Sequence, residues 1–107
     1  MVTKPDYSQS NPTDFYVPAL AINAVVYLNM SVIVPQLRNY MPLNFVEIYN
    51  PSTTTLTVRI ESPGGEMFRI EAGSSRTIRM AFNNLIITNI GGFALAANTA
   101  ILTLQKM

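Results

Sequence analysis

Apolar and polar residues alternate along much of the second half of the chain, and this period of two is typical of half-buried β-strands. Leu56–Ile60 shows it most clearly, with apolar residues at 56, 58 and 60 and polar residues between them. The runs expected to be strands are 44–49, 56–60, 67–71, 76–82, 85–89 and 100–104. Turn-forming residues separate them, notably Ser-Pro-Gly-Gly at 62–65, which predicts a hairpin between 56–60 and 67–71.

The segment 15–37, FYVPALAINAVVYLNMSVIVPQL, carries no charge. Prolines at 18 and 35 confine its apolar part to 16 residues, shorter than the roughly 20 that a membrane-spanning helix needs. Its Val and Ile residues are β-branched and favour strands. We therefore expect buried strands at about 19–27 and 28–34, while a membrane anchor formed by residues 15–37 stays open as an alternative.

The whole pattern predicts an all-β fold. No window of ten residues combines a helical apolar stripe with capping residues. Turn signals recur about every eight to twelve residues, as in a sandwich or barrel. The connections are too short for parallel crossovers, so the strands should be antiparallel. We predict an antiparallel β-sandwich of jelly-roll type with about seven or eight strands, formed by residues 15–107 as one domain after an extended N-terminal arm, residues 1–14.

Composition adds an expectation about assembly. The chain of 107 residues is 49% hydrophobic but only 12% charged, which is about half the charged fraction of an ordinary soluble domain. A chain this poor in charge usually hides more surface than one small core can, and forming an oligomer hides the rest. The net charge of +1 gives no strong attraction to nucleic acid or to anionic membranes.

Most of the charge lies on one predicted hairpin and the strand after it. Five charged residues there fall on the outward phase of their strands: Arg59, Glu61, Arg69, Glu71 and Arg79. If 59–61 pairs with 69–71, opposite charges meet as cross-strand neighbours. Because the signs alternate, we expect a solvated face, or the polar rim of an interface, rather than a basic stripe for a phosphate backbone.

The segment 81–105 is the opposite case, because it has no charge at all. Its strands 85–89 and 100–104 are apolar on both phases, and a strand of that kind is covered on both faces. A domain this small cannot supply both covers. With the uncharged segment 15–37 as companion, this predicts a subunit interface. The candidate interface residues are Ile22, Val26, Leu28, Val32, Ile86, Phe93 and Ile101.

Residue types needed for common catalytic chemistry are missing. The chain has no Cys and no His, which removes the commonest transition-metal ligands and the side chain best suited to proton transfer near neutral pH. Lys occurs only at 4 and 106, so the hydroxyl residues have no evident base. The glycine pairs at 64–65 and 91–92 precede no predicted helix, so no phosphate cradle is expected. We predict no enzyme, and no catalytic, cofactor or metal site.

Residues 46–105 resemble a pattern in small β-sandwich structural proteins of bacterial and archaeal viruses. The pattern has Asn with small polar residues, then x-V-x-I, then an I-x-A-G-S turn, and a late N-x-G…A-A-N stretch before the last strand. Its elements here are Asn50–Thr55, Val58–Ile60, Ile70–Ser74 and Asn89–Asn98. The resemblance implies a virion component such as a capsid, decoration, spike-base or tail subunit, usually oligomeric and without catalytic residues.

The expected function is therefore that of a non-enzymatic virion structural protein that acts by assembly. Its partners would be copies of itself, as a trimer or pentamer, and other virion proteins. Two alternatives stay open. One is a carbohydrate-binding β-sandwich that uses exposed tyrosines as a platform, and the other is a membrane-associated virion protein anchored by residues 15–37.

Overall fold

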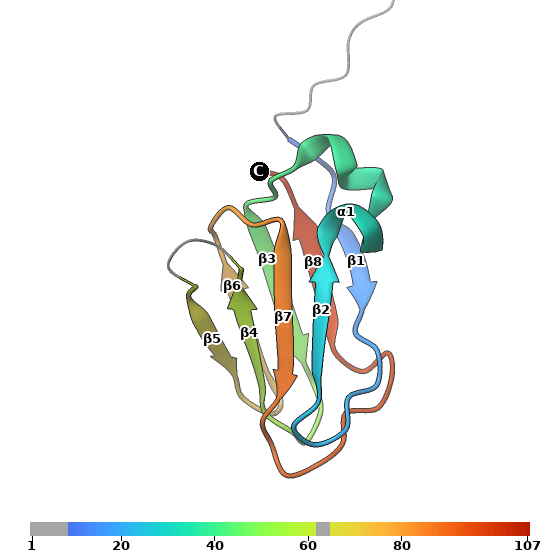
Figure 1. The fold of residues 1–107 in the computed structure, drawn as a ribbon, viewed down its shortest axis with the longest axis vertical. Helices are drawn as coiled ribbons and strands as arrows, with labels where there is room; N and C mark the ends of the chain where they lie inside the picture. The colour runs from blue at the N-terminus through green and yellow to red at the C-terminus, as the bar shows by residue number, and fades with distance from the viewer. Residues whose placement is uncertain (1–8, 62–64) are drawn as a thin grey trace, which may run out of the picture.

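The computed structural model describes residues 9–61 and 65–107. These residues form eight strands in two four-stranded antiparallel sheets, with two short helical segments at one end (Figure 1). The strands are β1 (Thr13–Tyr16), β2 (Val25–Asn29), β3 (Phe45–Asn50), β4 (Leu56–Ile60), β5 (Met67–Ile70), β6 (Ser74–Ile78), β7 (Asn84–Asn89) and β8 (Ile101–Gln105). The helical segments are α1 (Met30–Ile33) and the 3₁₀-helix η1 (Pro35–Tyr40).

The strand order identifies a jelly roll. One sheet has the order β1-β8-β3-β6 and the other β2-β7-β4-β5. Only the β4–β5 connection stays within a sheet, and every other connection crosses to the opposite one. Eight strands wound in this way are the double Greek key of a jelly roll. The predicted antiparallel β-sandwich is confirmed.

The core fills the space between the two sheets with alternate residues of each strand. Leu56, Val58 and Ile60 of β4 are buried, whereas Arg59 between them is exposed. Val46 and Ile48 of β3 do the same from the other sheet. Such inward-facing rows are what holds a sandwich together, because each sheet covers the apolar face of the other.

Most predicted strands lie within two residues of the observed ones, and β4 has the predicted bounds. Of the six strands predicted from residue 44 onward, the predicted strand 76–82 differs most from the observed bounds. Its counterpart β6 ends at Ile78 because the chain then crosses to the other sheet. The inward phase is nevertheless correct. Phe82 is buried and pairs with Leu43, with its N–H donating to the Leu43 carbonyl at 2.8 Å.

The predicted strand 28–34 is wrong, because helix α1 occupies most of it. Asn29 ends β2 and caps the helix, since its Oδ1 accepts from the Ser31 N–H at 3.1 Å and from Ser31 Oγ at 2.8 Å. The buried residues that follow, Met30, Val34 and Leu37, have the spacing of one helical face. This helical spacing was missed because the β-branched Val and Ile residues of the segment favour a strand.

The predicted arm 1–14 also needs correction at its end. Thr13 and Asp14 belong to β1 and pair with Leu104 and Thr103 of β8. Ser10 is already tied to the C-terminal segment, because the Lys106 N–H donates to Ser10 Oγ at 2.8 Å. Residues 1–8 of the arm, and residues 62–64 of the predicted hairpin turn, lie outside the described residues.

The β4–β5 hairpin is present, but its register differs from the predicted one. Arg59 pairs with Met67, and Arg69 pairs with Thr57, so the charges do not meet across the strands. The register follows from the connection, in which the Ile60 N–H donates to the Glu66 carbonyl at 2.8 Å. Arg69 instead forms an exposed ion pair with Glu71, at 2.6 Å between Nε and Oε1.

The uncharged segment 15–37 does not form a single long helix. It contains the end of β1, the whole of β2 and α1, and the start of η1. Among the described residues, no helix combines the length and the apolar character needed to cross a membrane.

Candidate functional site

The two uncharged segments, 15–37 and 81–105, lie side by side in the fold. β1 pairs with β8, and β2 pairs with β7. Beyond these strands Leu20 and Leu95 form a further bridge, with N–H to carbonyl distances of 3.0 and 2.8 Å. The two uncharged segments, which the sequence predicted to act together, are therefore neighbours in the fold.

The β1–β2 and β7–β8 loops lie at the end of the sandwich opposite α1 (Figure 1). Three large apolar side chains of these loops are exposed. Ile22 comes from the β1–β2 loop, and Ile90 and Phe93 come from the β7–β8 loop. Their exposed fractions are 50%, 41% and 61%. We call these three residues the apolar tip. The loops that carry them, 17–24 and 90–100, contain no charged residue.

A buried asparagine, Asn89, holds the loops of the apolar tip in place. Its Oδ1 accepts from Thr54 Oγ1 at 2.7 Å and from the Gly91 N–H at 3.1 Å. Its Nδ2 donates to the carbonyls of Leu20 at 3.1 Å and Phe93 at 2.8 Å. The side chain thus joins three loops, and all its hydrogen-bonding capacity is used, as burial requires.

A second buried asparagine, Asn50, orders the β3–β4 loop beneath this network. Its Nδ2 donates to the Thr54 carbonyl at 2.9 Å, and its Oδ1 accepts from Ser52 Oγ at 2.6 Å. Thr54, which contacts Asn89, is therefore itself held in position. Hydrogen bonds from the two asparagines therefore hold the backbone of the loops that carry the apolar tip.

Sequence reasoning missed both asparagines as part of a site. The alternation of buried residues could have shown that both asparagines face inward. Asn50 follows the inward-facing Val46 and Ile48, and Asn89 follows the inward-facing Leu85 and Ile87. An amide at an inward strand position must find hydrogen-bond partners inside the protein.

The predicted interface residues do not form one surface. Ile22 and Phe93 lie on the two loops of the apolar tip, and Val32 lies exposed on α1 at the opposite end. Ile86 and Ile101 point outward as predicted and are half-buried, but they belong to different sheets.

Val26 and Leu28 are a correction to the predicted set. Both face inward, since Leu28 belongs to the core and Val26 packs against it. They are therefore not available to a partner. Val25 and Tyr27 form the outward phase of β2 instead, with exposed fractions of 45% and 73%. The phase of this strand could not be predicted because both of its faces are apolar.

The five predicted rim residues are all exposed, but they do not surround the apolar tip. Glu71 lies nearest, because its Oε2 accepts from Thr55 Oγ1 at 3.5 Å, and Arg69 is paired with it. Arg59 and Glu61 lie toward the opposite end of β4. Arg79 lies over the ring of Phe45, 5.6 Å from its centroid.

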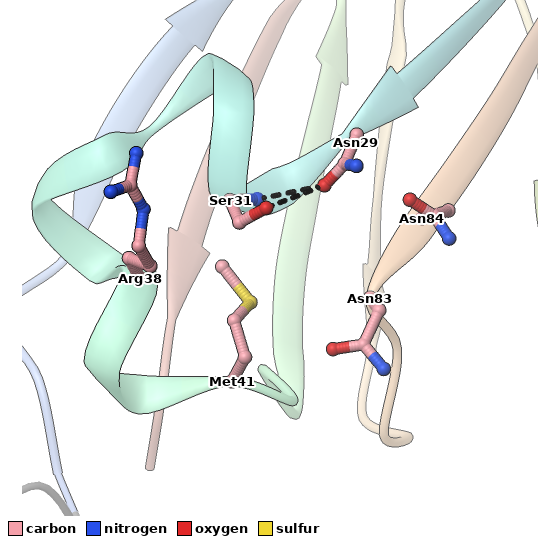
Figure 2. Close-up of a pocket in the computed structure, with 6 residues that line it drawn as sticks. All are labelled: Asn29, Ser31, Arg38, Met41, Asn83 and Asn84. Atoms are coloured by element: carbon pink, nitrogen blue, oxygen red, sulfur yellow. Dashed lines mark hydrogen bonds between the residues drawn. The ribbon is translucent and has the colours of Figure 1, made fainter.

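A polar pocket of about 340 Å³ lies beside α1 at the end away from the apolar tip (Figure 2). It is lined by Asn29, Ser31, Arg38, Met41, Asn83 and Asn84. Figure 2 shows Asn29 already engaged by Ser31, while Asn83 and Asn84 extend from the far side. Among the described residues, Arg38 has no ion-pair partner. The pocket offers amides and one guanidinium but no carboxylate, so it contains no acid–base pair.

Metal chemistry finds no support in the arrangement of acidic side chains. Across residues 9–61 and 65–107, no group of three or more Asp or Glu residues is placed to hold a metal ion. The five acids among these described residues, Asp14, Glu47, Glu61, Glu66 and Glu71, are too dispersed to share one ion.

No protein-family model matches the chain, and comparison with curated proteins finds no match either. The function is therefore inferred from the fold and from the surfaces described above.

Proposed function

We propose that this protein is a non-enzymatic structural subunit of a virion and that it works by oligomeric assembly through the apolar tip. The observation that carries the proposal is the exposure of Ile22, Ile90 and Phe93 on loops that the side chain of Asn89 ties together by hydrogen bonds. Large apolar side chains gathered on an uncharged surface mark interaction sites more often than chance exposure does.

The geometry of the tip favours a protein partner of matching shape. Phe93 and its two isoleucine neighbours have the character of interface anchors, which fill pockets on the partner and carry most of the binding energy. The neighbouring loop residues at 21, 94, 96 and 97 are alanines, whose side chains are short. Copies of the chain in a closed ring, such as a trimer or pentamer, would bring several tips together around one axis.

Two observations support a virion as the setting. Residues 46–105 resemble small structural proteins of bacterial and archaeal viruses in their turn chemistry. The chain also folds as a jelly roll, an architecture that recurs in viral capsid proteins. The same architecture serves other functions, so the fold contributes as analogy and the tip carries the assembly claim. Capsid, decoration, spike-base and tail positions all suit such a subunit.

Substitution of the tip tests the proposal. We expect Ile22→Ser, Ile90→Ser and Phe93→Ser each to weaken assembly about tenfold or more, since truncating a central apolar anchor typically costs over 1 kcal/mol. Sedimentation velocity over a range of protein concentrations measures the shift toward the free subunit.

Met67→Ser is the matched control. Met67 is as exposed as Phe93, at 65%, but lies on the edge strand β5 away from the tip. It should leave the sedimentation profile unchanged. If the tip variants assemble as well as the native chain, or if Met67→Ser disrupts assembly equally, the apolar tip is not the assembly surface.

A further inference from the structure

The outer face of the β1-β8-β3-β6 sheet carries two tyrosines in one row. Tyr16 of β1 and Tyr49 of β3 both pair with Ile101 of β8, one from each side. Two strand spacings separate them, which places their Cα atoms about 9.6 Å apart. Both side chains are about half exposed, at 53% and 49%. They point away from the core, as their positions between buried residues require.

Packing within the sheet leaves about half of each tyrosine side chain exposed to solvent. A cross-strand Tyr–Ile pair stabilises a sheet and explains why Ile101 is partly covered. It does not require two half-exposed rings on one row. Neither tyrosine hydroxyl forms a hydrogen bond with the described residues. The next residue of the row is Ser75, which is too short to cover Tyr49. The rings and hydroxyls are thus accessible to a ligand.

A polar row runs beside the tyrosines on the same face. It consists of Asp14, Thr103, Glu47 and Thr77 in neighbouring strands. Thr103 Oγ1 donates to Asp14 Oδ1 at 2.8 Å, which fixes that carboxylate and leaves its other oxygen free. Glu47 is exposed and has no partner among the described residues. Ionised carboxylates only accept hydrogen bonds, so Glu47 and the free oxygen of Asp14 can accept them from a ligand.

We propose that this face binds a neutral oligosaccharide. Sugar rings present C–H faces that pack on tyrosine, and hydroxyl groups that donate to carboxylates, so the two rows match the two chemistries of a glycan. The distance between the tyrosines suits alternate rings of an extended oligosaccharide. Asp14 and Glu47 would repel an acidic sugar, which selects against sialylated chains. This site lies on a sheet face, apart from the apolar tip, and does not depend on assembly.

A glycan array that carries both neutral and sialylated oligosaccharides gives the first test. The native chain should bind neutral members and not their sialylated counterparts. Calorimetric titration with the best neutral array glycan then measures affinity. Tyr16→Ala and Tyr49→Ala should each weaken it about tenfold or more, as truncation of a central aromatic contact does.

Tyr27→Ala is the matched control, because Tyr27 is an exposed tyrosine, at 73%, on the outer face of the other sheet. It should bind the same glycan with unchanged affinity. The proposal is overturned if no neutral array member binds, or if Tyr27→Ala weakens binding as much as the other two. It is also overturned if Tyr16→Ala and Tyr49→Ala lower the mass of the assembly instead of glycan affinity, because the face is then a protein interface.

Discussion

Gly91 lies where the β7–β8 loop crosses the β3–β4 loop, beneath the apolar tip. A Cβ at this position would overlap Thr54 Oγ1 and lie 2.6 Å from the Thr55 backbone nitrogen. We expect Gly91→Ala to lower the free energy of unfolding by about 1–3 kcal/mol, because the loops must separate to admit it. Urea denaturation measures the change.

Gly92→Ala is the control for this prediction. A Cβ there meets no atom within 4 Å, and the backbone has no positive φ. Its effect on stability should stay within about 0.5 kcal/mol. Equal destabilisation by the two alanines would show that loop packing at Thr54 does not hold the tip.

Partners of the buried amides could not be predicted from the sequence. Asn89 contacts Thr54, 35 residues away, and Leu20, 69 residues away. Alternation reveals that an asparagine faces inward, but only the three-dimensional fold shows which carbonyls and hydroxyls it meets. The exposed residues of the tip were predicted in part, since Ile22 and Phe93 were among the interface candidates and Ile90 was not.

Among the elements, those with one polar phase were predicted well. Leu56–Ile60 has a polar residue at every second position, so its bounds and inward side follow directly from the sequence. β2 is apolar on both sides, so its phase was undetermined, and the adjoining helix α1 was mistaken for a strand. The hairpin register depends on the length of the connection, which alternation does not report.

The strand order predicts how strongly each element is protected. β8 and β3 lie between two neighbours in one sheet, as β7 and β4 do in the other, whereas β1, β6, β2 and β5 are edges. We expect amide hydrogen exchange to be slowest in the four central strands, because their backbone groups are paired on both sides. Exchange measured by NMR would contradict this strand order if β5 were as protected as β7.

At the scale of the whole molecule, the low charge and the two uncharged segments predicted an exposed apolar surface before its place was known. The jelly roll brings those segments together by pairing β1 with β8 and β2 with β7. The β1–β8 pairing joins residues about 90 positions apart, such as Asp14 and Thr103. Composition therefore predicted exposed apolar residues, and the structure shows that Ile22, Ile90 and Phe93 lie on loops at one end of the sandwich.

The central claim is that further copies of the chain cover its exposed apolar tip. Light scattering of the native protein at several concentrations tests this most directly, since it gives mass without depending on shape. The account predicts a defined oligomer whose mass is a whole multiple of the 11.8 kDa chain and which dissociates on dilution. A monodisperse monomer of 11.8 kDa at every concentration would contradict it.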